Sequence, residues 1–350
     1  ALAAGCPVVV KAHEAHPSTS VSTAEIVHEA IAAAGAPEGI FRLVSGFAAG
    51  PALVQHPAIR AAGFTGSLRG GRALFDLATG RPDPIPFYGE MGSVNPSIVL
   101  PGAAASRPGE IAQAYAASLT VGTGQFCTNP GLLFVPDDPV MLQAAAAAIR
   151  NARGGPMLSS RIHEAFTTSS AALSARAGLR LVAQGQTGDI EPGGWGATPS
   201  AHSVDIETFA AQLDELAQER FGPAGLLVTY RDASELPAVL ARLEGQLTAS
   251  VHADPQDYEA VSAIQPVLAG IAGRLIFNGW PTGVAVNWAM NHGGPWPATT
   301  APGTTSVGAT AIRRWLVAVA YQSWPDQLLP PALRRENPLG IHRRVEEELT

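Results

Sequence analysis

The chain is poor in cysteine, in charge and in long apolar runs, and each shortage excludes a class of protein. Two cysteines, Cys6 and Cys127, are too few for a disulfide framework, and they favour a reducing, cytoplasmic location. Charged residues make up only 15 % of the chain, yet no apolar run reaches the roughly 18 residues of a membrane span. The net charge is −7, and the sequence has no stripe of basic residues. We therefore expect neither a membrane nor a nucleic acid as a partner.

Lysine is almost absent as well. Of 22 cationic side chains only Lys11 is a lysine, and it ends "PVVVK" (7–11), a short apolar run typical of a buried strand. Cys6 lies beside that run, where we expect a thiol of the core. The chain has no initiator Met and reaches this strand within a few residues, so we expect that a further segment of the protein precedes Ala1.

What the chain does contain favours an α/β protein. An apolar fraction of 46 % over 350 residues is enough for two domains. Over the first 90 residues short apolar runs alternate with helical patterns, as they do in a parallel, doubly wound sheet. The expected strands are 7–11, 41–46 and 59–66, and the expected helices are 18–35, a short one around 51–56 and one that begins at Ser67.

The rest of the chain continues this alternation less regularly. The segment "IPFYGEMGSVNPSIVL" contains two strand-like pieces, and a helix at 108–121 leads to the loop that holds Cys127. Two stretches rich in Gly and Pro, 185–203 and 291–308, are expected to be loops, and the second is expected to cover a site or an interface. Further expected strands are 132–135, 225–230 and 274–279, and further expected helices are 139–152, 160–177 and 234–244.

Two residues are candidates for nucleophilic or acid–base chemistry. Cys127 lies in "VGTGQFCTNPG", where it is either a small buried apolar side chain or a nucleophile that a loop presents. Glu90 lies between Gly89 and Gly92 in "FYGEMGSVNP", where it is either a general base or an exposed turn carboxylate. Neither motif decides between its two interpretations by itself.

Two weaker motifs accompany them. In "FTGSLRGG" a strand ends and a helix begins, so Gly66, Ser67 and the helix N-terminus can hold an anion, although the motif is not the G-x-G-x-x-G fingerprint. In "ERFGPAGLLV" the residues Glu219 and Phe221 precede a turn and a strand. They are either an acceptor beside an aromatic face or an ordinary helix end.

Taken together, these motifs resemble the aldehyde dehydrogenase superfamily. In chain order they are "VVVK" followed by Glu14, "FTGS" with Gly71, "GEMG", "GQFC" and "ERFGP". Glu90 precedes Cys127 by 37 positions and Glu219 follows it by 92, spacings that are similar to those of the family. Longer strings such as "GQFCTNPG" and "FNGWPTGVAVNWAMNHGGPWPATT" resemble its α-ketoglutaric semialdehyde dehydrogenase branch. The resemblance covers essentially the whole chain.

The resemblance implies the chemistry of the site. Cys127 would be the nucleophile, which forms a thiohemiacetal with the aldehyde and then a thioester, and Glu90 would activate the water that hydrolyses this thioester. The cofactor would be NADP or NAD. Its expected contacts are Lys11 and Glu14 at the adenosine ribose, Gly66, Ser67 and Gly71 at the pyrophosphate, and Glu219 and Phe221 at the nicotinamide ribose and ring.

The resemblance also implies how the chain is organised. We expect a truncated dinucleotide-binding domain at 1–90, a catalytic domain at 91–312 and a C-terminal oligomerisation tail at 313–350. An upstream Asn that donates to the oxyanion in the family would be missing, so we expect low activity from this chain alone. The expected partners are a small aldehyde and further copies of the chain. The run "RRWLVAVAYQ" (313–322) resembles the tail strand that adds to a neighbouring subunit.

Two other classes of protein stay open. A cysteine hydrolase needs a histidine within reach of Cys127, and none of the nine histidines lies in a matching motif. A non-catalytic assembly protein of the same fold would self-associate, with a thiol no more reactive than a free cysteine. The motif "HEAH" (13–16) lacks the i, i+4 histidine pair of a zinc-binding helix, so we expect no metal.

Overall fold

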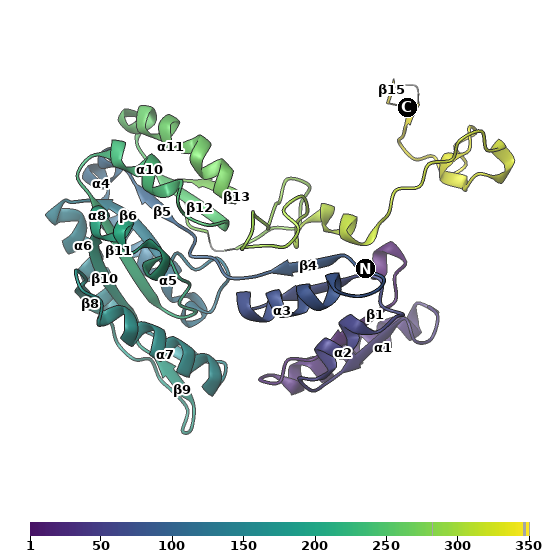
Figure 1. Ribbon diagram of the computed structural model, residues 1–350, viewed down its shortest axis with the longest axis horizontal. Helices are drawn as coiled ribbons and strands as arrows, with labels where there is room; N and C mark the ends of the chain where they lie inside the picture. The colour runs from purple at the N-terminus through teal and green to yellow at the C-terminus, as the bar shows by residue number, and fades with distance from the viewer. Residues whose placement is uncertain (282, 346–347, 350) are drawn as a thin grey trace. The chain divides into compact units, whose positions relative to one another are not determined.

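The computed structural model describes residues 1–281, 283–345 and 348–349 (Figure 1). They form two units, Ala1–Arg314 and Trp315–Thr350. The first unit contains both of the domains that we expect before residue 312, so a domain boundary at residue 90 stays a prediction.

A seven-stranded sheet is the centre of the first unit. Its strand order is β13-β12-β5-β6-β11-β10-β8, and all neighbours are parallel except β10 and β8. Helices on both faces of a mostly parallel sheet define an α/β protein, as the sequence predicts. The strands are β5 (Ser97–Val99), β6 (Leu132–Pro136), β8 (Arg180–Gln184), β10 (Ser200–Asp205), β11 (Ala224–Tyr230), β12 (Gln246–His252) and β13 (Ala272–Phe277).

The side chains of this sheet alternate between two apolar layers. In β6, Leu132 and Phe134 pack into one buried cluster, whereas Leu133 and Val135 pack into the other. Successive strand residues point to opposite faces, so a strand that is covered on both sides is apolar throughout. The first layer contains α8 (Ile206–Ala211), α9 (Leu213–Leu216), α10 (Leu236–Leu240) and α11 (Tyr258–Ile271), and the second contains α4 (Pro101–Ser106), α5 (Pro108–Thr120) and α6 (Pro139–Asn151).

The first 90 residues alternate strand and helix as expected, but their strands pair in two separate sheets. β1 (Val8–Lys11) pairs in parallel with β2 (Phe41–Val44), and β3 (Ala62–Thr65) pairs in parallel with β4 (Phe87–Glu90). Helix α3 lies along β4 (Figure 1). The helices are α1 (Pro17–Ala33), α2 (Ala49–Gln55) and α3 (Leu68–Thr79).

The structure adds elements that the sequence pattern did not predict. The expected loop at 185–203 contains β9 (Trp195–Ala197), which pairs with β7 (Gly155–Met157), and it includes the start of β10. Between β11 and β13 the sequence predicts one helix, but the chain forms α10, β12 and α11 there. The expected helix at 160–177 is α7 (Ser160–Ser174).

The second unit has little regular structure. The 3-10 helix Ala309–Trp315 ends at the first residue of this unit, and residues 316–322 of the expected tail strand have no helix or strand. Two short 3-10 helices, Asp326–Leu328 and Pro331–Leu333, follow. Val317 is 89 % exposed. The unit includes a short antiparallel pair, β14 (Arg344–Val345) and β15 (Glu348–Leu349).

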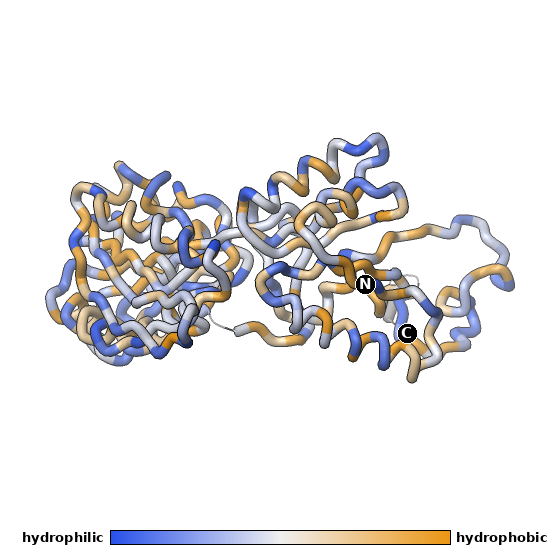
Figure 2. Tube along the Cα trace, turned by 90° about the horizontal axis from the view of Figure 1, so that it is seen from below, coloured by the Kyte–Doolittle hydropathy of each residue, from blue (hydrophilic) through white to orange (hydrophobic). Residues whose placement is uncertain are grey.

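Hydrophobic and hydrophilic residues are interspersed along the helices (Figure 2). Within the described ranges, no helix combines the length and the apolar character that crossing a membrane would require.

Candidate active site

Glu90 is held at the end of β4 between two segments of backbone. On one side, the Gly66 N–H donates to the Glu90 carbonyl over 3.1 Å, which continues the pairing of β3 with β4. On the other side, the Met91 N–H donates to the Ala298 carbonyl over 2.8 Å. The Glu90 side chain is only 5 % exposed. It is therefore a buried carboxylate and not an exposed turn residue.

A sharp turn presents Cys127. After α5 the chain passes through Gly122, Thr123 and Gly124 with φ values of 55°, 58° and 70°, all in the left-handed region. A Cβ on Gly124 would lie 2.2 Å from the Gly222 carbonyl carbon, so only glycine fits at this position. A left-handed Thr123 costs about 1–3 kcal/mol, which the surrounding structure must offset. Strain of this kind is typical of functional loops.

A buried polar network fixes the Cys127 loop to the central sheet. The Asn95 side-chain amide donates to the carbonyls of Cys127 and Asn129, each over 2.9 Å. The side-chain oxygen of Gln246, at the start of β12, accepts from the Ser93 hydroxyl over 2.9 Å and from the Asn95 N–H over 3.1 Å. Because buried polar groups are costly when left unpaired, this network strongly favours one loop position.

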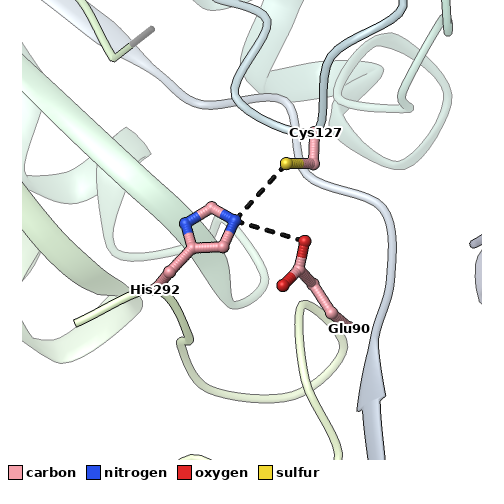
Figure 3. Close-up of side chains that lie close together, drawn as sticks. All are labelled: Glu90, Cys127 and His292. Carbon is pink, nitrogen blue, oxygen red and sulfur yellow. Dashed lines mark hydrogen bonds and ion pairs between the residues drawn. The ribbon is translucent and has the colours of Figure 1, made fainter. Parts of the chain in front are cut away.

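His292 connects the thiol and the carboxylate. Its Nε2 lies 3.4 Å from Cys127 Sγ and 3.2 Å from Glu90 Oε1 (Figure 3). The ring is 3 % exposed. Its backbone is fixed by Thr305 and Ser306, because the His292 N–H donates to Thr305 Oγ1 and the His292 carbonyl accepts from the Ser306 N–H. The Ser306 hydroxyl also donates to Glu90 Oε2 over 2.5 Å.

The charges of this centre follow from burial and from these hydrogen bonds. Burial, followed by the negative charge of Glu90, raises the pKa of Cys127 to about 12, so its resting form is the thiol. Burial alone would raise the pKa of Glu90 too. Hydrogen bonds with His292, Ser306 and Cys127 outweigh burial and hold the Glu90 pKa below its usual value. A neutral thiol thus faces an ionised carboxylate, with an imidazole nitrogen in contact with both.

Glu219 and Phe221 precede β11, just as Cys127 precedes β6, and these two strands are parallel neighbours. A Cβ on Gly92 would lie 2.6 Å from the Glu219 carboxylate, so Glu219 reaches the turn that follows Glu90. Burial raises the pKa of Glu219 to about 7, although a hydrogen bond from the Ser93 N–H opposes this shift. Phe221 is 38 % exposed, so part of its ring is open to solvent.

The helix start expected to bind pyrophosphate has the predicted local structure. Ser67 is the N-cap of α3, and its hydroxyl accepts from the Gly70 N–H over 3.2 Å. Close packing leaves no room for a side chain at Gly66 or Gly71. A Cβ would meet the Phe64 ring at 2.7 Å from Gly66, and Met91 Sδ at 2.5 Å from Gly71.

Lys11 and Glu14 form a local pair on the other small sheet. Lys11 ends β1, and its ammonium donates to the Glu14 carboxylate. The Glu14 side chain is exposed. Their expected contacts with a nucleotide ribose stay predictions.

Sequence reasoning missed His292 and Ser306. Their signal was present, because both lie in the stretch 291–308 that is expected to cover a site, and His292 lies in one of the strings that carry the family resemblance. No spacing rule connects His292 with Cys127, 165 positions earlier. No sequence motif marks a histidine as a neighbour of the thiol, but folding brings His292 into contact with it.

Similarity to known sequences extends over the whole chain. Residues 1–296 match the sequence profile of the Aldehyde dehydrogenase family. The chain is 46 % identical over 350 residues to "Alpha-ketoglutaric semialdehyde dehydrogenase 2" of Azospirillum brasilense and 42 % identical over 353 residues to "Alpha-ketoglutaric semialdehyde dehydrogenase" of Acinetobacter baylyi. These matches cover 98 % and 100 % of this chain but 66 % of either relative, so the chain spans about two thirds of their length.

Solved structures agree with the fold. Proline Utilization A of Bradyrhizobium japonicum, in a mutant form, superposes with a TM-score of 0.73 at 26 % identity, over 88 % of this chain and 31 % of that one. A gamma-glutamyl-gamma-aminobutyraldehyde dehydrogenase from Burkholderia cenocepacia superposes with a TM-score of 0.74 at 24 % identity, over 89 % of this chain and 62 % of that one. The second match supports the fold alone. By profile, by sequence identity and by fold, this chain belongs to the aldehyde dehydrogenase family.

Proposed function

We propose that this chain carries the reactive centre of an NAD- or NADP-dependent aldehyde dehydrogenase, with Cys127 as the nucleophile and Glu90 as the base. The observation that supports this most is the contact of Cys127 Sγ with His292 Nε2, which in turn contacts Glu90 Oε1. A loop nucleophile that faces a buried carboxylate is the arrangement that covalent catalysis followed by hydrolysis requires.

The residues expected to bind a dinucleotide fit such a group in two places. The first turn of α3 has no acidic residue, and Ser67 caps Gly70, so the other first-turn N–H groups are available to a pyrophosphate. Glu219 is buried beside the turn that follows Glu90, where it can accept from ribose hydroxyls. When bound, an oxidised nicotinamide supplies the hydride acceptor of the reaction.

Deprotonation of the thiol is the first task of the protein. A pKa near 12 leaves almost no thiolate at neutral pH, so Sγ needs a proton acceptor within contact. Glu90 hydrogen-bonds with the thiol and is the group that can accept this proton. His292 Nε2 lies 3.4 Å from Sγ and hydrogen-bonds to Glu90 Oε1, which keeps the carboxylate beside the thiol. Sγ then attacks the aldehyde carbon, the S–C bond forms, and the carbonyl oxygen becomes an oxyanion. The Cys127 backbone N–H is its expected donor.

Hydrolysis of the thioester is the second task. Loss of hydride from the thiohemiacetal leaves an acyl group on Sγ. Glu90 first releases the thiol proton to solvent. It then accepts a proton from water, the resulting hydroxide attacks the acyl carbon, and the C–S bond breaks to release a carboxylic acid and the thiolate. The bonds of Ser306 to Oε2 and of His292 to Oε1 fix the orientation of the Glu90 carboxylate.

We propose 2-oxoglutarate semialdehyde as the substrate, because two relatives at 46 % and 42 % identity carry names that refer to it. Homo-oligomers are the proposed assembly.

Cys127→Ser tests the nucleophile. We expect the variant to lose aldehyde-dependent reduction of NAD or NADP completely while its nucleotide affinity stays nearly unchanged, because the thiol does the chemistry and contributes little to cofactor binding. Nucleotide reduction is followed by absorbance and nucleotide affinity by titration, with Cys6→Ser as the matched control. Retained turnover in Cys127→Ser would refute the assignment.

Alkylation with iodoacetamide provides a second test that needs no aldehyde. We expect Cys127 to react faster than Cys6, because the neighbouring carboxylate takes up the thiol proton as the new S–C bond forms, which offsets the raised pKa of Cys127. Equal reactivity of the two thiols, without nucleotide reduction by the wild-type chain, would instead favour a non-catalytic assembly protein.

A further inference from the structure

We propose that Glu90, Cys127 and His292 form a binding site for a zinc ion, which would block the nucleophile reversibly. These residues bring a carboxylate oxygen, a thiol sulfur and an imidazole nitrogen within 4.8 Å of one another. Sulfur, nitrogen and oxygen are the three donor types that zinc accepts in proteins. Each of these side chains comes from a different segment of the chain, and each segment is fixed by its own hydrogen bonds.

The spacing of the donor atoms fits a tetrahedral ion. With zinc–ligand distances of about 2.0–2.3 Å, the donors of a tetrahedral site lie about 3.3–3.6 Å apart. Sγ and Nε2 are separated by 3.4 Å, and Nε2 and Oε1 by 3.2 Å (Figure 3). Two of the three donor pairs therefore match this geometry, and the third, Sγ with a Glu90 oxygen, lies within 4.8 Å.

Burial and charge both favour a cation at this position. Glu90 and His292 are 5 % and 3 % exposed, so little competing water reaches their donor atoms. Cys127 is half-buried and provides the side from which an ion can enter. Binding exchanges the Sγ–H bond for an Sγ–zinc bond, and the proton leaves to solvent. Two anionic donors then neutralise the ion, and no oxidation or reduction is involved.

The surroundings of the three donors predict a moderate affinity. The Ser306 hydroxyl holds the second oxygen of Glu90, as supporting residues do in metal sites. His292 Nδ1 is buried and has no hydrogen-bond partner among the residues that the structure describes. Metal-ligating histidines usually donate from their second nitrogen, so this site lacks one of the usual supports. Three protein donors also leave a fourth position for water, as in exchangeable zinc sites.

The bound ion would occupy both groups that the proposed reaction needs. Sγ could not attack an aldehyde, and Glu90 could not accept a proton. We therefore expect inhibition that a chelator reverses. The binding itself requires neither aldehyde nor nucleotide, so it can be measured even if the proposed activity is wrong.

The test is a titration of the purified chain with Co²⁺ as a spectroscopic substitute for zinc. A thiolate ligand produces a ligand-to-metal charge-transfer band in the near ultraviolet. We expect this band to saturate at one ion per chain and to disappear when Zn²⁺ displaces the cobalt. Cys127→Ser should abolish the band, and His292→Asn should weaken binding by at least about tenfold, the lower limit for loss of a supporting residue alone.

Two further variants control for a folding defect in His292→Asn and for cobalt binding at other histidines. Glu90→Gln keeps the shape of the side chain and removes its charge, so it tests the third donor if His292→Asn does not fold. His13→Asn removes one ring of the stacked pair His13–His16, the other place where histidines gather, and it should leave the titration unchanged. A band that survives in Cys127→Ser, or an affinity that neither His292→Asn nor Glu90→Gln lowers, would overturn the proposal.

Discussion

Glu90 is the last residue of β4 and Glu14 comes soon after β1, but the surroundings of these two carboxylates differ. Glu90 is buried, and three side chains from distant parts of the sequence hydrogen-bond to it. Glu14 is exposed, and the side chain that pairs with it is Lys11, three residues earlier. The Lys11–Glu14 contact joins close neighbours in sequence, so it can form without the rest of the fold. The buried contacts of Glu90 form only when the whole unit is folded.

Glu90 is expected to take part in the reaction, whereas Glu14 is expected only to contact the nucleotide. A buried carboxylate interacts strongly with its neighbours, because the low local dielectric amplifies each charge and each hydrogen bond. An exposed ion pair is screened by water and salt, and its contribution is small. We therefore expect large effects from changes around Glu90 and Glu219 and small effects around Glu14.

The largest effect after loss of the nucleophile is expected for Glu90→Gln. Without a base, thioester hydrolysis should slow by about 10²–10⁴-fold, the usual contribution of general base catalysis. A burst of reduced nucleotide should survive at a lower rate, because hydride transfer precedes hydrolysis and the thiol can still lose its proton to solvent. Stopped-flow absorbance measures burst and steady state together, with the exposed Glu110→Gln as the control. Equal loss of both phases would show that Glu90 is no more important for hydrolysis than for the steps before hydride transfer.

Glu219→Gln is expected to stabilise the free chain at neutral pH. The folded-state pKa is raised by burial to about 7, so the folded protein binds the proton more tightly than the unfolded one. The stabilisation that protonated Glu219 contributes to the folded state is complete below pH 4.5, the pKa of this group in the unfolded chain. It is lost as the pH rises through about 7, the pKa in the folded state. At about 1.4 kcal/mol per pKa unit, the ionised form costs about 3 kcal/mol at pH 8.

Urea unfolding at pH 5 and pH 8, without nucleotide, tests this expectation. Glu219→Gln should raise the free energy of unfolding at pH 8 and change it little at pH 5. Glu207→Gln, an exposed residue of α8, is the matched control. If the two variants behaved alike at both pH values, the Glu219 carboxylate would not be desolvated in solution.

His292→Asn is expected to slow alkylation of Cys127 by iodoacetamide. Losing the imidazole that contacts Sγ and orients the Glu90 carboxylate should lower the rate about tenfold at pH 7, which corresponds to about one pKa unit. The difference should narrow as the pH rises, because hydroxide then removes the thiol proton directly. Added imidazole should restore part of the rate. His202→Asn is the control, since His202 is also buried but bonds to Ser174. A rate unaffected in His292→Asn would remove His292 from thiol activation.

Local chemistry explains which parts of the fold were predictable. Strands β1, β2 and β6 are short apolar runs, and α3 begins at the predicted Ser67, so pattern and structure agree. β12 was missed because "QLTASVH" is fully buried despite its polar residues, two of which, Gln246 and Thr248, hydrogen-bond to a distant segment. α11 was missed because Pro266 lies inside it and interrupts the helical pattern.

The same distinction applies to the site. Cys127 and Glu90 were recognisable as candidates from short glycine-containing motifs, although only the family resemblance assigned their expected roles. His292 was not, since its role depends on a contact across 165 residues that no local pattern encodes. The expected roles of Lys11, Glu14 and Glu219 remain predictions that nucleotide binding must test.

The smallest effect is expected for Glu14→Ser. The Lys11 ammonium hydrogen-bonds to the Glu14 carboxylate and lowers its pKa, so the carboxylate is ionised at neutral pH. A carboxylate here would repel the 2′-phosphate of NADP, and the serine variant would leave Lys11 free to attract it. Because exposed charges interact weakly, we expect the affinity ratio to shift toward NADP by about fivefold at most. Titrations with both nucleotides measure this ratio, and the exposed Glu25→Ser in α1 is the control. An unchanged ratio would place the 2′-phosphate elsewhere, whereas a shift that vanishes at high salt would confirm a purely electrostatic effect.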